Sequence, residues 1–238
     1  TEITIEKAKT FKEIPDVSQI GFGKYFTDHM FEMDYNPEEG WHNPRVVPYR
    51  DLNINPANTT LHYGQAIFEG IKAFKQNRDI VLFRPLEYLN RLNRSANIMC
   101  IPNVDVDVVH RGLRKLIDLD KNWVPDHEGT SLYIRPFIFA TDNYLGVNVS
   151  STYKLLIILS PVGAYYSAGF NPVKIMVEEE YVRAVPGGLG EAKTPANYAA
   201  SLRASVTAHD KGYAQSLWLD GIERKYIEEV GSMNILFK

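Results

Sequence analysis

The stretch Val185-Pro-Gly-Gly-Leu-Gly-Glu-Ala-Lys-Thr-Pro-Ala-Asn-Tyr198 brings a glycine-rich segment up to one lysine at the expected start of a helix. Thr194 is a good N-cap, and Pro195 suits the first helical position, where a backbone N–H would have no partner in the helix. Lys193 and Tyr198 then occupy the N′ and N4 positions, whose side chains commonly pack across the first turn. The sequence therefore predicts that the amine of Lys193 lies close to the phenol of Tyr198.

The same stretch indicates which chemistry the lysine serves. A Walker A nucleotide loop is excluded, because Ala192 stands directly before Lys193, where that pattern requires glycine. A lysine amine held beside a second polar group is suited to bond with a carbonyl carbon. The segment therefore indicates carbonyl chemistry rather than nucleotide binding.

The composition of the chain predicts a globular protein that acts on small molecules. Its 238 residues are 45% hydrophobic and 12% aromatic, which is ample for a core. A net charge of −3 gives no general attraction to nucleic acid or anionic membranes. Cys100 is the only cysteine, which excludes an intrachain disulfide and a Cys-based zinc site, so no metal is expected. With no apolar run of roughly 18 residues and no signal-peptide pattern, a cytoplasmic protein is expected.

Three helices are predicted from apolar residues at helical spacing. The first begins at Pro85 and the third follows Thr194, running to Lys211 before Gly212. The residues expected to share one face are Leu86, Leu89, Asn93 and Ala96 in the first helix, Val106, Val109, Leu113, Leu116 and Ile117 in the second, and Tyr198, Leu202 and Val206 in the third.

Short apolar runs between turn residues predict strands. Residues 71–75 and 80–83 form an expected hairpin, and 131–140 and 153–159 are two longer strands. Pro136 interrupts the first of these, which predicts an edge strand or a bulge because proline cannot donate to a sheet ladder.

These elements predict an α+β protein of two domains. Residues 1–160 are expected to form a small domain, in which 1–60, rich in Pro, Asn and Asp, form loops and edge strands. Residues 161–172 have the composition of an interdomain loop, and 173–238 open a second domain with a strand at 173–177.

Six segments along the chain carry a family resemblance in a fixed order. They are Tyr63–Gly70, Phe83–Ser95, Ser131–Pro136, Pro161–Tyr165, Gly190–Tyr198 and Glu229–Asn234. Together they resemble the branched-chain amino acid aminotransferases, which belong to the fold type IV group of pyridoxal-phosphate enzymes. The resemblance implies a smaller α/β N-terminal domain, followed by the first part of a larger domain that binds pyridoxal 5'-phosphate.

The resemblance also implies a set of cofactor-binding residues. Lys193 corresponds to the lysine that forms a Schiff base with pyridoxal phosphate and moves the proton at the substrate's α carbon. Glu229 corresponds to the carboxylate that keeps the ring nitrogen protonated, and Tyr198 to the tyrosine bonded to the phenolic oxygen. Arg91 corresponds to the arginine that binds the phosphate, and Ser232 to a hydroxyl position near the ring.

The implied reaction transfers an amino group between branched-chain L-amino acids and 2-oxoglutarate. The resemblance places Phe68, Tyr133, Arg135 and Tyr165 around the substrate, with Tyr63 reaching it from a partner subunit, which implies a homodimer. Arg135 is a cation in the middle of an apolar strand and needs a partner. The hypothesis is that it binds the distal carboxylate of glutamate.

The chain departs from the family pattern in two places. Pro195 and Ala196 stand where the family usually has two glycines, so the backbone after Lys193 is expected to be stiffer. The family also continues beyond the pattern at Glu229–Asn234, with backbone groups that bind phosphate and substrate. We therefore expect that a polypeptide of these residues alone folds poorly and does not turn over substrate.

Two alternatives remain open from the sequence. D-amino-acid transaminases and aminodeoxychorismate lyases share the lysine and glutamate, although Ser131–Pro136 and Pro161–Tyr165 favour the branched-chain group. The other alternative is a non-catalytic module that binds the cofactor or dimerises. The cofactor bound to lysine gives a visible absorbance band. A module that binds no cofactor shows no such band, so absorbance separates that kind of module from an enzyme.

Overall fold

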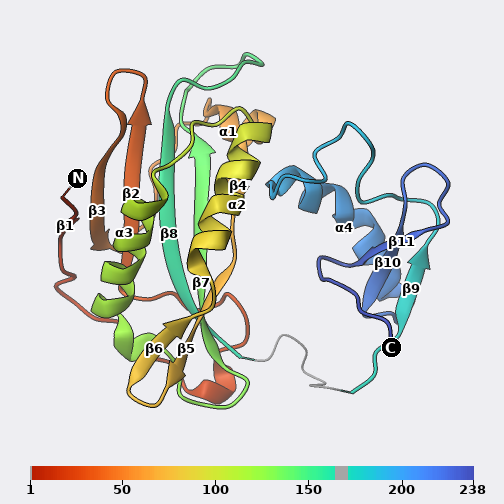
Figure 1. Cartoon of the computed structure of the whole chain (residues 1–238), viewed down its shortest axis with the longest axis horizontal. Coiled ribbons are helices and arrows are strands. Elements are labelled where there is room, and N and C mark those ends of the chain that lie inside the picture. The colour runs from red at the N-terminus through yellow and green to blue at the C-terminus, as the bar shows by residue number, and fades with distance from the viewer. Residues whose placement is uncertain (1, 164–170) are drawn as a thin grey trace. The chain divides into compact units, whose positions relative to one another are not determined.

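The structure is a computed structural model and describes residues 2–163 and 171–238. The chain divides into two compact units, Thr1–Gly169 and Phe170–Lys238 (Figure 1). Each unit combines helices and strands, which confirms the α+β class. The predicted domain limits stay predictions, and part of the interdomain loop predicted at 161–172 lies outside the described residues.

The first unit is built on an eight-stranded sheet. Seven strands follow the order β1-β3-β2-β8-β7-β5-β6, and β4 also pairs with β7. All neighbours are antiparallel except β1 and β3. The strands are β1 (Thr4–Ile5), β2 (His29–Asn36), β3 (Gly40–Pro48), β4 (Ala66–Phe68), β5 (Ile71–Gln76), β6 (Asp79–Leu82), β7 (Ser131–Ala140) and β8 (Tyr153–Val162). The hairpin predicted from 71 to 83 is confirmed as β5 and β6.

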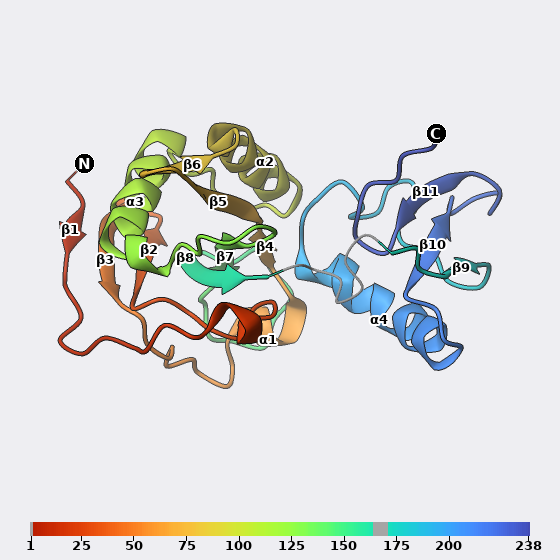
Figure 2. The same ribbon diagram turned by 90° about the horizontal axis from the view of Figure 1, so that it is seen from below.

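Helices cover both faces of this sheet. α2 (Pro85–Ile98) and α3 (Val106–Leu119) lie on one side, and α1 (Thr59–Tyr63) lies on the other (Figure 2). Two 3₁₀ turns, η1 (Val17–Gln19) and η2 (Lys121–Trp123), complete the helical elements that the structure describes in this unit. The main core lies between the sheet and the pair α2 and α3, and includes Phe31, Met33, Ile67, Leu89, Leu92, Leu113, Ile134 and Leu159.

The predicted helix faces are partly confirmed. In α3 four of the five predicted residues, Val109, Leu113, Leu116 and Ile117, are buried, and Val106 is half-buried. In α2 Leu89 and Ala96 are buried as predicted, but Leu86 is 42% exposed. Leu92 packs into the core instead. The predicted apolar face of α2 is therefore turned slightly away from the face that packs against the sheet.

The prediction that residues 1–60 form loops and edge strands is wrong for β2. This strand lies in the interior of the sheet between β3 and β8. All residues from His29 to Met33 are buried, because α3 covers one side and an apolar cluster with Met30, Val47 and Leu156 lies on the other. A strand buried on both faces loses the alternation that identifies an exposed one.

The prediction that Pro136 marks an edge strand or a bulge is also wrong, because β7 is an interior strand that keeps one register with its neighbours on either side of Pro136. β7 pairs with β8 along its length and on the other side with β5 and β4, through residues 132–134 and 137–139. The neighbouring strand breaks at Glu69 and Gly70, opposite Pro136, where the amide of Glu69 donates to the carbonyl of Pro136 at 2.8 Å. The missing N–H of Pro136 therefore faces a break in the adjacent strand rather than solvent.

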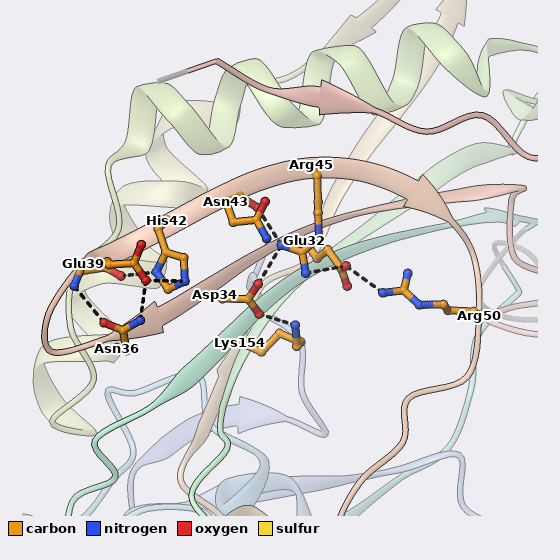
Figure 3. Close-up of polar contacts among 10 residues, drawn as sticks. Glu32, Asp34, Asn36, Glu39, His42, Asn43, Arg45, Arg50 and Lys154 are labelled. Atoms are coloured by element: carbon orange, nitrogen blue, oxygen red, sulfur yellow. Dashed lines mark hydrogen bonds and ion pairs between the residues drawn. The ribbon is translucent and has the colours of Figure 1, made fainter.

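A cluster of charged side chains extends from β2, β3 and β8 (Figure 3). Glu32 is fully buried, forms an ion pair with Arg45 at 2.7 Å and accepts a hydrogen bond from Arg50 at 2.8 Å. Asp34 accepts from Arg45 at 2.7 Å and also contacts Lys154. Burial opposes ionisation of Asp34, but the hydrogen bonds from Lys154 and Arg45 outweigh it and hold the pKa of this carboxyl below its ordinary value.

The second unit holds a three-stranded sheet in the order β11-β10-β9. β9 (Ile175–Glu178) and β10 (Gln215–Leu219) are parallel, and the helix α4 (Pro195–Asp210) connects them. β11 (Ile227–Val230) is antiparallel to β10. This β-α-β connection is the usual way to join parallel strands, and it places the start of α4 after the glycine-rich segment.

The limits of α4 agree with the capping prediction. Thr194 is the N-cap, Lys211 is the C-cap and Gly212 follows with a φ of 79°. Of the residues predicted to share a face, Leu202 and Val206 are 63% and 52% exposed, and the buried residues of the helix are Ala204 and Ala208. No described helix of either unit is long and apolar enough to cross a membrane.

Candidate active site

Lys193 and Tyr198 lie together at the start of α4. The amine of Lys193 donates to the phenolic oxygen of Tyr198 at 2.8 Å and lies 5.4 Å from the centre of its ring. Both side chains are half-buried. The contact predicted from the capping positions is therefore present, and it directs the lysine along the first turn of the helix.

Asn197 holds the glycine-rich segment against the same turn. Its side-chain amide donates to the carbonyls of Leu189 at 2.8 Å and Ala192 at 2.7 Å. These bonds fix the backbone immediately before Lys193. The sequence analysis missed Asn197, although an asparagine one residue before the key tyrosine is a local signal for a side chain that satisfies loop carbonyls.

Glu229 and Ser232 share a pocket with Tyr198. The pocket is lined by residues of α4, β11 and the segments beside them: Arg183, Asn197, Tyr198, Ser201, Glu229, Gly231 and Ser232. Glu229 pairs with Trp218 on β10, whereas the neighbouring Glu228 is exposed. The structure therefore brings together the lysine, the tyrosine and the carboxylate that the sequence singled out in the second unit.

The turn after Glu229 is held tightly to β10. The amide of Gly231 donates to Ser216 at 2.8 Å, and its carbonyl accepts from the indole of Trp218 at 2.8 Å. Gly231 has a φ of 58°, and a side chain there would overlap the amide oxygen of Gln215. The positive φ and the crowding by Gln215 favour glycine here, and this turn sets where Glu229 and Ser232 lie.

Arg183 is the charged partner of Glu229. Its Nε lies 2.5 Å from Oε2 of Glu229, as an ion pair that lacks hydrogen-bond geometry among the described residues. Burial raises the pKa of Glu229 above its ordinary value, while the charges of Arg183 and Lys193 act in the opposite direction. The sequence gives no signal for Arg183, because the two residues lie far apart in the chain.

Arg91 lies on α2 in the first unit and is paired with a buried carboxylate. Its Nε and one terminal nitrogen donate to the two oxygens of Glu69 at 2.6 Å and 2.7 Å. The guanidinium also lies 5.3 Å from the ring centre of Tyr88. Glu69 stands inside the first resembling segment, yet the sequence analysis gave it no role.

Phe68, Tyr133 and Arg135 form a second cluster in the first unit. The guanidinium carbon of Arg135 lies 4.5 Å from the ring centre of Phe68, and a terminal nitrogen donates to the hydroxyl of Tyr133 at 2.7 Å. Gly70 makes the arrangement possible, since a Cβ there would lie 2.5 Å from that hydroxyl. In the structure Arg135 thus contacts an aromatic ring and a phenol, and its pairing with the distal carboxylate of glutamate stays a prediction.

Three predicted site residues remain: Tyr63, Ser232 and Tyr165. Tyr63 ends α1 and is 43% exposed, with its ring centre 6.2 Å from that of His62. Ser232 is exposed beside Glu229. Tyr165 lies outside the described residues. Within 2–163 and 171–238, no group of three or more His, Cys, Asp or Glu side chains could hold a metal ion.

Known sequences resemble this chain over nearly its whole length. Residues 66–238 match the family described as Amino-transferase class IV. Branched-chain-amino-acid aminotransferase 2 of Bacillus subtilis (strain 168) is 57% identical over 237 residues, which are 99% of this chain and 65% of that protein. The chain thus spans just under two thirds of the length of this relative.

Solved structures of branched-chain aminotransferases are also similar to this chain. A branched-chain amino acid aminotransferase from Escherichia coli has a TM-score of 0.65 and 28% identity, covering 85% of this chain and 61% of that one. The T.th. branched-chain amino acid aminotransferase, complexed with N-(5'-phosphopyridoxyl)-L-glutamate, has a TM-score of 0.62 and 22% identity, covering 83% and 61%. The second likeness concerns the fold alone. The chain belongs to the class IV aminotransferase family.

Proposed function

We propose that the protein transfers the amino group between branched-chain L-amino acids (leucine, isoleucine and valine) and 2-oxoglutarate, with pyridoxal 5'-phosphate as cofactor. The observation that carries the proposal is the amine of Lys193 at 2.8 Å from the phenol of Tyr198, together with Glu229, whose carboxylate shares a pocket with that tyrosine. Relatives of high sequence identity, which are named as branched-chain-amino-acid aminotransferases, supply the substrate class.

The residues of the second unit fit pyridoxal phosphate by their chemistry. The amine of Lys193 suits its aldehyde, the phenol of Tyr198 suits its phenolic oxygen, and the carboxylate of Glu229 suits its ring nitrogen. These three groups lie within one small region. When bound, the cofactor supplies a protonated ring that accepts the electron pair left by the substrate's α proton. Lys193 holds the aldehyde carbon and then carries that proton as base and acid, while Tyr198 and Glu229 orient the ring. Ser232 is proposed to contact the ring of the cofactor.

The residues of the first unit are proposed to bind charged parts of the ligands. Arg91 binds the phosphate, a role that suits a guanidinium fork. Arg135, held by Phe68 and Tyr133, binds the distal carboxylate of glutamate or 2-oxoglutarate. The aromatic rings leave an apolar surface for branched side chains. Tyr165, and Tyr63 from the partner subunit of a homodimer, are proposed to complete the substrate pocket.

Absorbance and amino transfer test this proposal. In a polypeptide that also carries the family's C-terminal part, mixing with pyridoxal phosphate is expected to give a visible band that borohydride removes, and conversion of 2-oxoglutarate to glutamate with leucine as donor. Residues 1–238 alone are expected to give no turnover. The same assay with D-leucine and with D-alanine separates a D-amino-acid transaminase from the proposed enzyme. A band without amino transfer would instead support a non-catalytic cofactor-binding module, and the absence of a band would refute the assigned cofactor chemistry.

A further inference from the structure

Glu69 is a fully buried carboxylate whose charge is balanced by Arg91. It accepts two hydrogen bonds from the guanidinium, at 2.6 Å and 2.7 Å, and a third from the amide of Gly70 at 3.2 Å. Arg91 itself is 43% exposed, so the pair extends from the core to the surface. A buried ion requires such a partner, because an unpaired charge in the interior is strongly destabilising.

The break between β4 and β5 places Glu69 where it can reach α2. Ile67 and Ile71 belong to the core between the sheet and α2 and α3, and Glu69 lies between them in the chain. Phe68 points to the opposite face, toward Arg135. Because side chains alternate along an extended chain, the segment directs one residue to each arginine.

The contact geometry fixes the plane of the Arg91 guanidinium. Glu69 engages one edge of the fork, formed by Nε and one terminal nitrogen. A guanidinium has five N–H donors, so a carboxylate bonded in this way leaves the others directed away from it. Arg91 lines a surface hollow with Arg84, Arg94 and the carboxylate of Glu87. Three guanidinium groups and the two carboxylates of Glu87 and Glu69 therefore lie at or near this hollow, which leaves a net positive charge there.

We propose that Glu69 is a positioning residue, which orients Arg91 so that its outward N–H groups can bind the phosphate of the cofactor. The inference rests on the proposed function, since it refines the phosphate role of Arg91. An arginine on an exposed helix face has many conformations, and fixing its plane in advance lowers the conformational entropy lost on binding. Glu69 contributes affinity for phosphate without contacting it.

The test compares two probes, pyridoxal 5'-phosphate and pyridoxal, which differ only in the phosphate. The affinity of each is measured by titrating the visible band in the wild type and in Glu69→Gln. We expect the ratio of the two affinities to fall on the order of tenfold in E69Q, as when a side chain that orients a ligand-binding group is removed. The affinity for pyridoxal itself is expected to stay nearly unchanged, because it makes no use of Arg91.

Glu32→Gln is the matched control. Glu32 is also fully buried and paired with arginine, so E32Q removes a comparable charge from the same unit. Its affinity ratio is expected to equal that of the wild type. The double variant E69Q/R91A is expected to have the ratio of R91A alone, because a positioning residue acts only through its partner. Glu69→Asp, which keeps the charge but shortens the reach, gives the same test if E69Q fails to fold.

The outcomes separate the inference from the function on which it rests. Equal ratios in the wild type and E69Q, with the band present in both, would overturn the positioning role alone. Equal falls in E69Q and E32Q would show a general effect of instability and overturn it too. A wild type that gives no borohydride-sensitive band overturns the proposed function, and the role of Glu69 with it.

Discussion

The amine of Lys193 lies 2.8 Å from the phenolic oxygen of Tyr198, one turn into α4. Tyr198→Phe removes one hydrogen bond but leaves the lysine, so the borohydride-sensitive band should remain. A hydrogen bond that involves a charged group contributes about 1.5–3 kcal/mol, so amino transfer should slow by about 10- to 100-fold. Single-turnover kinetics with leucine measure the change. Lys193→Ala should abolish the band, whereas Lys211→Ala, at the other end of the helix, should keep it.

Arg135 is held over Phe68 and against Tyr133, and it should distinguish the two substrates. Arg135→Ala is expected to lower kcat/KM for 2-oxoglutarate by at least about tenfold, because a charge-assisted bond is lost, and to affect leucine less. Steady-state kinetics with each substrate varied in turn measure the two values. An equal loss for both substrates would remove the distal-carboxylate role.

Gly70 has no room for a methyl group beside the hydroxyl of Tyr133. Gly70→Ala should therefore displace the tyrosine, weaken its bond to Arg135 and lower stability by about 1–3 kcal/mol, as overpacking generally does. Urea unfolding measures the stability change. Adding Tyr133→Phe removes the nearest atom and should recover part of the loss. No recovery in the double variant would mean that Gly70 is needed for another reason.

Arg183 lowers the pKa of Glu229, whereas burial raises it. Removing this charge in Arg183→Gln should raise the pKa further. Because Glu229 must be ionised to face a protonated ring nitrogen, the acidic limb of the pH–rate profile should move to higher pH. The profile of kcat for leucine measures this shift. Arg203→Gln, an exposed arginine on α4, should leave the limb where it is.

The lowered pKa of Asp34 predicts that the stability of the first unit depends on pH. Its pKa is lower in the folded protein than its ordinary value, so the stabilisation is fully present above the ordinary pKa and is lost as pH falls through the folded value. Asp34→Asn should cost about 1 kcal/mol at pH 7 and much less at a pH below the folded pKa of Asp34. Urea unfolding at each pH measures the cost. An equal cost at both pH values would contradict the prediction.

The parts predictable from sequence were those governed by local rules. The start of α4 follows from Thr194 and Pro195, and the contact between Lys193 and Tyr198 follows from it. The face of α3 follows from helical spacing. In each case the residues that decide the structure lie within a few positions of one another, so their pattern is readable without the rest of the fold.

The parts that were missed depend on residues distant in the chain. Arg183 meets Glu229 only after β9, α4 and β10 have formed. The interior place of Pro136 depends on a break in another strand at Glu69. Sequence patterns carry no signal for such pairings, because either residue alone fits an exposed position equally well.

The position of β2 has a consequence for how the protein is made. β2 and β3 form a hairpin early in the chain, but the other neighbour of β2 is β8, roughly 100 residues later. At about 5–20 residues per second, a ribosome leaves that edge of β2 open for about 5–20 s. An inward-pointing charge is one device that keeps an open edge from pairing with another molecule. Glu32 lies on β2 and its partner Arg45 on β3, so this ion pair can form within the hairpin and protect the nascent chain before β8 exists.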